Sequence, residues 1–337
     1  MRISVLIPCH NEEKSIRKCV ESCLNQTRKF DEIVVVNDGS TDKSGEILAT
    51  FGNAIKVITI PKATGNKSHA QERGLKKVTG DIFVATDGDT LLDAGFAQAV
   101  EIGMADEKIV ALGGYVKSLP YNWLTACRAF EYCVGQNLHK LAQSYINFMF
   151  VIPGAAGAFR TKEFKKHIKF DHDTLTEDLD FTYKFHKLGL KIGYTRDAIC
   201  WTQDPASLSQ YINQIRRWYG GGFQCLRKHW TVIKSPAVAF ELSLLYVEGM
   251  ISSFIMFVLP FINFYMGLVA FISYIISCMV FALWFAVKDK RWDLLYVPFI
   301  YFFLVLINAY ILFEQFGKEM LMNKKNLVWF HPERVEI

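Results

Sequence analysis

The feature that most constrains the fold is a long apolar block in the last third of the chain. Between Ala237 and Val287 the sequence carries only two charged residues, Glu241 and Glu248. An apolar stretch of about 18 residues or more is long enough for a helix to cross the hydrocarbon core of a bilayer. Residues 1–235 instead have the composition of an ordinary soluble enzyme. We therefore predict a soluble module, 1–235, followed by a membrane module.

The apolar block divides into three candidate transmembrane helices, at 237–260, 264–287 and 294–313. They make up a membrane region, 237–316, that leaves a polar tail, 317–337. With 1–235 in the cytosol, two crossings return the basic loop at 288–291 to the cytosol, as the positive-inside rule prefers. A third crossing places the lysines of the tail outside. Either one segment is re-entrant or the tail departs from the rule.

Composition and charge exclude several classes of protein. A chain that is 51% hydrophobic and 21% charged is neither disordered nor fibrous. The net charge is only +5, and basic residues gather around the apolar block. This pattern indicates that the basic residues attract anionic lipid headgroups and a diphosphate rather than nucleic acid. The sequence shows no signal peptide, so we expect a multi-pass protein of the plasma or inner membrane with its catalytic domain in the cytosol.

Eight cysteines are present, without a CxxC pair. Their spacing matches neither a metal site nor a secreted disulfide framework. We expect them to act as small apolar packing residues in a reducing compartment.

The soluble module begins with alternating strand and helix patterns. Short apolar runs predict strands, and polar or amphipathic runs predict helices near 12–25 and 68–77; the strands are expected at 3–7, 32–36, 56–60 and 81–86. This alternation predicts an α/β fold with a mostly parallel, doubly wound sheet. In such sheets, ligands bind beyond the carboxyl ends of the strands. Asp38, Asp87 and Asp89 come at those ends and are the first candidate site residues.

Asp87-Gly88-Asp89 is the central motif. Two carboxylates that flank one residue can share a hard divalent cation with a diphosphate, and the glycine lets a ligand approach the backbone. The alternative is a turn that caps a helix near Leu91. Asp38 can accept hydrogen bonds from a nucleotide base or ribose, or it can form an Asx turn. Lys67, in a loop before a helix, suits a phosphate, but taken by itself it favours the alternative of a solvated side chain.

Two further motifs follow. Glu177 and Asp178 precede an aromatic helix, where a carboxylate can serve as the general base for a hydroxyl group or simply cap the helix together with Thr176. Gln214, Arg217 and Trp218 share one helical face, at spacings i, i+3 and i+4. Arginine suits a pyrophosphate and tryptophan stacks on sugar rings. The alternative for this face is an Arg/Trp pair at the membrane interface.

Amphipathic patterns predict two longer helical segments, at about 119–148 and 207–230. Their apolar residues recur every three or four positions and mark one face of each helix. One interpretation is that these helices cover the sheet. The other is that they lie along the bilayer surface, as basic, aromatic-rich amphipathic helices do.

Taken in order, these motifs resemble the family 2 inverting glycosyltransferases of the membrane-bound polysaccharide-synthase type. That group contains hyaluronan, chitin, poly-N-acetylglucosamine and cellulose synthases. The resemblance runs from residue 3 to about residue 218 and includes the opening Pro8-Cys-His-Asn-Glu12 and the Gly154-Ala-Ala-Gly-Ala-Phe-Arg160 loop. It implies a GT-A fold, a UDP-sugar donor and Mg²⁺ or Mn²⁺ as cofactor.

The resemblance also implies a role for each motif. Asp38 would hold the uridine, Asp87 and Asp89 would bind the nucleotide and the metal, and Asp178 would be the base, with Glu177 beside it. The implied donor-binding residues are Pro8, Asn11, Glu12, Asp38, Lys67, Asp87, Gln214 and Arg217. The implied acceptor-binding residues are Gly154, Gly157 and Trp218.

The favoured function is therefore transfer of N-acetylglucosamine, or next glucose, from a UDP-sugar to the end of a growing β-linked glycan. One alternative is transfer of a single sugar to a membrane lipid, either a sphingolipid or a polyprenyl carrier. A second is a non-catalytic membrane scaffold with a nucleotide-binding domain. Three spans are few to enclose a polysaccharide, which leaves open a short product, a second copy of the chain or a partner membrane subunit.

Overall fold

The computed structural model describes residues 1–337 except 147, 235, 244–247, 323–333 and 337. The chain forms two compact units. The first consists of Met1–Leu119 and Lys140–Gln203 together with residues 334–336. The second consists of Pro120–His139 and the described part of Asp204–Asn326.

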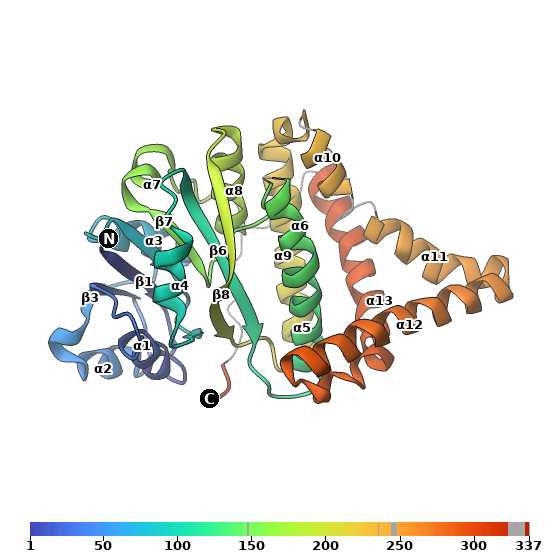
Figure 1. Cartoon of the computed structure of the whole chain (residues 1–337), viewed down its shortest axis with the longest axis horizontal. Helices are drawn as coiled ribbons and strands as arrows, with labels where there is room; N and C mark the ends of the chain where they lie inside the picture. Colours follow the sequence, from blue (N-terminus) through green and yellow to red (C-terminus); the bar gives the residue numbers. More distant parts are fainter. Residues whose placement is uncertain (147, 235, 244–247, 323–333, 337) are drawn as a thin grey trace. The chain divides into compact units, whose positions relative to one another are not determined.

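The first unit is built on one mixed sheet of eight strands (Figure 1). In chain order these are β1 (Ile3–Cys9), β2 (Glu32–Asp38), β3 (Lys56–Ile60), β4 (Ile82–Ala85), β5 (Leu91–Leu92), β6 (Ile109–Ser118), β7 (Gly157–Arg160) and β8 (Lys191–Thr202). Their order across the sheet is β3-β2-β1-β4-β7-β6-β8-β5. The four predicted strands are confirmed as β1 to β4.

Four of the seven strand pairings are parallel. The pairs β1/β2, β1/β4 and β2/β3 follow the prediction, and β6/β8 adds a fourth. The short strand β7 differs, because it runs antiparallel to both β4 and β6. The carboxyl ends of β1, β2 and β4 therefore meet at one edge of the sheet, where the predicted site residues follow.

Seven α-helices complete the described part of the first unit. They are α1 (Ile16–Leu24), α2 (Ser44–Ala49), α3 (Lys67–Leu75), α4 (Phe96–Gly103), α6 (Lys140–Tyr145), α7 (Thr161–His167) and α8 (Glu177–Lys187).

An aromatic cluster fixes the position of α8 on the sheet. Phe159 of β7 stacks on Phe83 of β4 at 5.1 Å between ring centroids and meets Phe181 of α8 edge-on at 5.4 Å. Burial of each such ring stabilises the fold by about 1.5–3 kcal/mol. The start of α8, with Glu177 and Asp178, is thereby anchored to the core.

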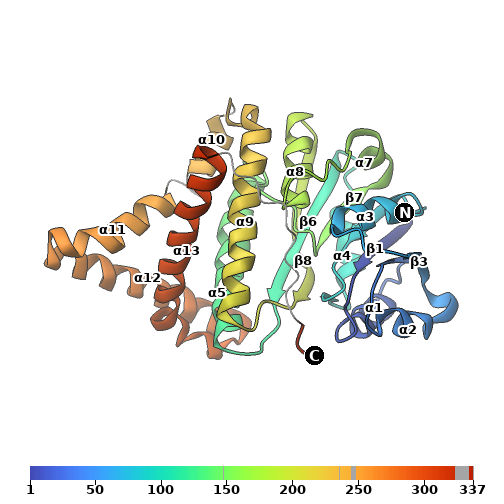
Figure 2. The same cartoon turned by 180° about the vertical axis from the view of Figure 1, so that it is seen from behind.

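The second unit contains only helices among its described residues (Figure 2). They are α5 (Trp123–Val134), α9 (Leu208–Lys228), α10 (Pro236–Leu242), α11 (Glu248–Ile262), α12 (Phe264–Asp289) and α13 (Val297–Phe316). The apolar faces of α5 and α9, the predicted amphipathic helices, pack against α12 and α13 in one buried cluster. Polar contacts also join α9 to α13, such as Arg216 Nε to Glu314 Oε2 at 2.8 Å. Within this unit, the amphipathic faces are thus covered by the apolar helices.

Two helices among the described residues are long and apolar enough to cross a membrane. They are Phe264–Asp289 and Val297–Leu321, with mean hydropathies of 2.3 and 2.0 over their most apolar windows. They correspond to the predicted spans 264–287 and 294–313. The predicted span 237–260 includes 244–247, which lie outside the described residues, and it stays a prediction. The second predicted span follows Asn263, whose side chain accepts a hydrogen bond from Met266 N and caps α12.

All eight cysteines are buried, as predicted for packing residues.

Gly39, in the turn after β2, offers a test of local backbone geometry. Its φ is +60°, and a Cβ atom there would lie 2.2 Å from the backbone nitrogen of Ala63. Replacing Gly39 with alanine should therefore lower the free energy of unfolding by about 2–4 kcal/mol, through strain and a backbone clash. Gly52 is the matched control, because its φ is +53° but the space around it is open. Thermal unfolding of the detergent-solubilised chain should show a clearly smaller loss for Gly52→Ala, and equal losses would contradict the clash.

Candidate active site

A cluster of acidic side chains lies at the carboxyl ends of the parallel strands β1 and β4. Glu12 follows β1, and Asp87 and Asp89 follow β4. The residues Glu12 and Asp89 are only 4% and 5% exposed. The alternative of a helix cap at Leu91 is wrong, because Leu91 forms strand β5 instead. The Asp-Gly-Asp motif thus places its carboxylates beside a third one, where burial of negative charge demands a cation.

Lys67, the first residue of α3, supplies one such cation. Its Nζ lies 2.5 Å from Asp87 Oδ1 and 3.3 Å from Glu177 Oε1. Burial disfavours the charged ammonium, but Asp87, Glu177 and Asp178 outweigh that cost and raise the pKa of Lys67 above its usual value. The alternative of a solvated lysine is therefore wrong. Lys67 links three elements, α3, the loop after β4 and the start of α8.

Arg334 supplies the second cation, and sequence reasoning did not predict it. Its Nη1 lies 2.7 Å from Asp89 Oδ2, and its Nη2 lies 3.0 Å from Glu12 Oε1. The backbone carbonyl of Arg334 accepts a hydrogen bond from Lys14 Nζ at 3.1 Å. The next residue, Val335, exchanges two hydrogen bonds with the side-chain amide of Gln203, at 3.1 and 3.2 Å. A segment of the predicted polar tail is thus bound at the acidic cluster.

The donor set of this cluster fits a hard divalent cation. Mg²⁺ and Mn²⁺ prefer carboxylate oxygens, which Asp87 and Asp89 provide from one strand end. Burial raises the pKa of the Asp89 carboxyl to about 6, against the opposing effect of Arg334 and with a further increase from Glu12. The same oxygens already attract two side-chain cations, which is the behaviour expected of a cation-binding site.

The candidate base lies across from this cluster, at the start of α8. Thr176 is the N-cap residue but makes no side-chain capping hydrogen bond, so only the Thr176 part of the predicted helix cap is wrong. Asp178 Oδ1 accepts a hydrogen bond from Leu179 N at 2.9 Å. A Cβ atom on Gly154 would lie 3.2 Å from Lys67 Nζ and 3.6 Å from Asp178 Oδ2. The Gly154 backbone therefore passes directly beside Lys67 and Asp178.

Other predicted residues shape the surrounding loops. Asp38 accepts two hydrogen bonds from Thr64, through its backbone nitrogen at 3.0 Å and its hydroxyl at 2.5 Å. Asn11 has a φ of +54°, and its Oδ1 accepts from Thr41 N at 2.8 Å. Both side chains thus hold the loops at the site edge of the sheet in place.

The other two predicted site residues of the first unit, Pro8 and Gly157, lie within strands. Pro8 belongs to β1 and pairs in register with Val36. A Cβ atom on Gly157 in β7 would lie 2.9 Å from the Phe159 ring. Close packing therefore explains why a glycine occupies position 157.

Gln214, Arg217 and Trp218 belong to α9 in the second unit. The ring of Trp218 lies 4.6 Å from the guanidinium carbon of Arg128, in a cation–π contact. Arg128 Nε also lies 3.3 Å from Asp204 Oδ1. The structure therefore gives Trp218 a partner in α5.

A mixed sheet with an acidic cluster at the carboxyl ends of its parallel strands agrees with what the resemblance to the family 2 glycosyltransferases implies. Residues 1–221 match the family model described as "Glycosyltransferase like family 2". The chain therefore belongs to the family 2 glycosyltransferases, as its motifs predicted.

Curated relatives share this assignment. A poly-β-1,6-N-acetyl-D-glucosamine synthase of Staphylococcus epidermidis is 28% identical over 70% of this chain and 58% of its own length. A probable glycosyltransferase of Bacillus subtilis, YdaM, is 30% identical over 72% of this chain and 58% of its own length. The chain thus spans less than two thirds of the length of these relatives.

Solved structures share the fold. The mannosyltransferase PcManGT from Pyrobaculum calidifontis, determined with GDP-Man and Mn²⁺, superposes with a TM-score of 0.65 at 18% identity, over 96% of this chain and 88% of that one. Residues 1–349 of S. aureus TarS, determined with UDP-GlcNAc, superpose with a TM-score of 0.51 at 18% identity, over 95% of this chain and 92% of that one. The predicted GT-A fold is confirmed.

Proposed function

We propose that the protein is a membrane-bound, metal-dependent, inverting glycosyltransferase that extends a β-linked glycan from a UDP-sugar. The observation that carries this proposal is the meeting of Glu12, Asp87 and Asp89 with Lys67, Glu177 and Asp178 at one edge of the sheet. That arrangement provides carboxylates for a divalent cation, a cation for a diphosphate and a carboxylate for a hydroxyl proton.

Each residue then has a definite task. Asp178 accepts the proton of the acceptor hydroxyl, which attacks the face of the sugar opposite to the leaving group and inverts its configuration. Lys67 neutralises charge on the diphosphate as the sugar departs. A Mg²⁺ or Mn²⁺ ion held by Asp87 and Asp89 would add further stabilisation of that charge. Asp38 is proposed to contact the uridine, with Thr64 holding its carboxylate in position.

The proposed donor is UDP-N-acetylglucosamine, with UDP-glucose as the second choice. Curated relatives named poly-β-1,6-N-acetyl-D-glucosamine synthase support this choice. Gly154, beside Asp178, is proposed to border the acceptor, and Gln214, Arg217 and Trp218 are proposed to complete the donor and acceptor sites.

The membrane location is part of the proposal. The helices Phe264–Asp289 and Val297–Leu321 support it by length and composition. We propose that 1–235 is the cytosolic catalytic domain and that 237–316 lies in the membrane, in contact with lipids and with a second copy or a partner subunit. One of the three predicted segments is then re-entrant, because Arg334 of the tail lies at the acidic cluster on the cytosolic side. The first predicted span, 237–260, belongs to this proposal.

UDP release tests the activity directly. The detergent-solubilised protein should release UDP from UDP-N-acetylglucosamine in the presence of Mn²⁺ and an acceptor, faster than from UDP-glucose or UDP-galactose. With radiolabelled donor, the product should form a ladder of β-linked oligomers. No release from any UDP-sugar would favour the non-catalytic scaffold.

A lipid acceptor is the second candidate function. Only two helices among the described residues qualify as membrane spans, which is few to enclose a polysaccharide. One discrete, lipid-soluble product in place of the ladder would establish this candidate and exclude glycan extension.

Arg334 provides a test of the cation site. Because its guanidinium pairs with Asp89 and Glu12, it competes with a divalent cation for the same carboxylates. Replacing Arg334 with alanine should lower the Mn²⁺ concentration for half-saturation about 3- to 10-fold, as removal of a nearby positive charge favours the ion. The electron paramagnetic resonance signal of unbound Mn²⁺ measures this, with Arg334→Lys as the charge-conserving control. An unchanged half-saturation in Arg334→Ala would show that the arginine and the ion do not compete.

A further inference from the structure

We propose that His69, Glu72 and His172 form a binding site for Zn²⁺ or a similar divalent transition-metal ion, distinct from the acidic cluster. His69 and Glu72 lie on α3, and His172 lies in the loop between α7 and α8. No part of the proposed sugar transfer uses these three side chains.

Their geometry is that of a ligand set. His69 and Glu72 are three residues apart on α3, so they share one face of the helix. The potential ligand atoms of all three side chains lie within 4.8 Å of one another. His172 Nε2 lies 3.4 Å from Glu72 Oε2. Two ligands bound at about 2.0–2.2 Å to one tetrahedral Zn²⁺ are separated by about that distance.

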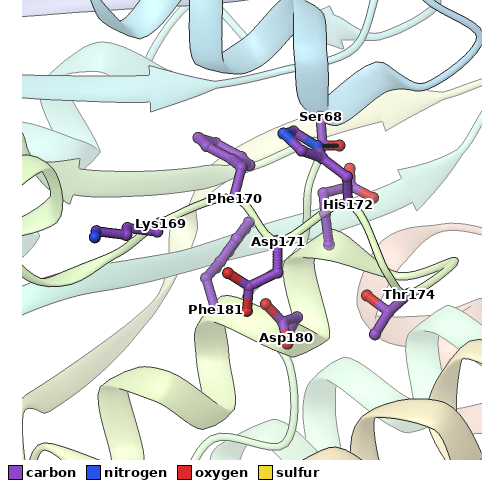
Figure 3. A pocket seen from close by; sticks show the side chains of 9 residues that line it. Ser68, Lys169, Phe170, Asp171, His172, Thr174, Asp180 and Phe181 are labelled. Atoms are coloured by element: carbon purple, nitrogen blue, oxygen red, sulfur yellow. Dashed lines mark hydrogen bonds between the residues drawn. The ribbon is translucent and has the colours of Figure 1, made fainter.

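Hydrogen bonding defines which nitrogen of His172 faces the ion. Ser68 Oγ donates to Asn66 Oδ1 at 2.9 Å, which uses the only proton of the hydroxyl group. The 2.6 Å contact between Ser68 Oγ and His172 Nδ1 must then be donated by the histidine. In the neutral ring, Nε2 therefore carries the lone pair, and it is the nitrogen nearest Glu72. Figure 3 shows His172 beside Ser68 at the start of α3. Such an outer hydrogen bond is typical of metal-binding histidines.

The two imidazole rings, from α3 and from the loop before α8, stack on each other. Their centroids are 3.6 Å apart, with an interplanar angle of 24°. His172 itself adopts a φ of +54°, a conformation that is uncommon for a residue other than glycine.

The ligand types of these three side chains indicate which ion they would bind. Two imidazoles and one carboxylate suit Zn²⁺, whereas Mg²⁺ and Ca²⁺ prefer oxygen ligands alone. The side chains of His172 and Glu72 are 23% and 41% exposed, which lets an ion enter and leaves a position for water. The neighbouring acidic residues Asp171 and Asp180 differ from this ligand set in that a lysine already pairs with them. Lys184 Nζ lies 2.7 Å from a carboxylate oxygen of each.

A bound ion would clamp two elements that carry site residues. α3 begins at Lys67, and the His172 loop leads into α8, which begins at Glu177. Metal binding should therefore raise the midpoint temperature of thermal unfolding. Neither this effect nor the binding depends on transferase activity, so the site and the proposed function can fail separately.

Zinc titration of the metal-stripped, detergent-solubilised full chain tests the site. A chromophoric chelator reports bound Zn²⁺, and excess Mg²⁺ keeps the acidic cluster occupied. The wild type should bind one equivalent. The single substitutions His69→Ala and His172→Ala should weaken binding by about 100-fold or more, and Ser68→Ala by about 10-fold. Co²⁺ in place of Zn²⁺ should give the visible spectrum of a four-coordinate nitrogen and oxygen site, and this spectrum should disappear in His172→Ala.

His167 offers a matched control. Its Nε2 also lies 3.4 Å from a glutamate oxygen, that of Glu163 one turn away, but it belongs to no group of three potential ligands among the described residues. His167→Ala should bind Zn²⁺ like the wild type, and so should Asp89→Asn. The proposal is overturned if His172→Ala, shown to be folded by circular dichroism, keeps wild-type affinity, or if His167→Ala loses as much affinity as His172→Ala. Should His172→Ala fail to fold, Glu72→Gln replaces it in the same comparison.

Discussion

Replacing Asp178 with asparagine is expected to slow sugar transfer by about 10³-fold, within the range of about 10²–10⁴-fold that a positioned general base contributes. The amide keeps the size of the side chain but cannot accept a proton. Asp178 lies at the start of α8, beside the Gly154 backbone and close enough to Lys67 to raise its pKa. UDP release with saturating donor and acceptor measures the loss. Binding of the donor should change little, because the substitution affects the proton transfer and not the diphosphate.

Two comparisons make this result specific. Asp171→Asn removes an exposed carboxylate from the loop before the same helix and should leave the rate within about twofold, as expected of a surface substitution. Glu177→Gln removes the carboxylate 3.3 Å from Lys67 and should cost less than Asp178→Asn, since it weakens an ion pair. A larger loss of activity for Glu177→Gln would indicate that Glu177, and not Asp178, is the base.

The second large effect is expected at the acidic cluster. Asp89→Asn should lower transfer by about 10²–10³-fold, because it removes a carboxylate proposed to hold the divalent ion that stabilises the leaving diphosphate. The wild type should lose activity in EDTA and regain it with Mg²⁺ or Mn²⁺. In Asp89→Asn, restoration should require a much higher metal concentration. UDP release over a metal titration measures both.

Asp93 supplies the control for this variant. It is an exposed carboxylate four residues further along the chain, and Asp93→Asn should leave the metal titration unchanged. Turnover that persists in EDTA would contradict the metal role of both Asp87 and Asp89. A loss of activity in Asp89→Asn without any change in the metal titration would instead indicate that Asp89 binds only Arg334 and not the metal ion.

The sequence predicted the first half of the sheet well, and the reason is physical. Strands β1, β2 and β4 are buried along most of their length, so they appear as short apolar runs that are easily recognised. Strand β7 has only four residues, Gly-Ala-Phe-Arg, which is too short to show a period. Its antiparallel pairing depends on contacts with β4 and β6 that lie far from it in sequence, and no local pattern reports them.

The sequence could predict those site residues that directly follow the ends of strands. Asp87 and Asp89 follow a parallel strand, and the topology alone brings them near Glu12. Lys67 by itself favoured the interpretation of a solvated side chain, because its partners come from two other segments. Arg334 gave no signal, since a single arginine in a polar tail matches no periodic pattern. The donor-binding role of Asn11 stays a prediction, and in the structure its side chain orders a neighbouring loop.

The pairing of Glu12 with Arg334 spans 322 residues of sequence, and this has a consequence for synthesis. A ribosome makes the sheet and the acidic cluster early, and it makes Arg334 only after both long apolar helices. Contacts between such distant residues close a long loop and form late in folding. A nascent chain therefore exposes its cluster of carboxylates without Arg334 until translation has passed the helices that are proposed to enter the bilayer. Docking of Arg334 on the cluster would then mark a molecule whose apolar helices have already been made.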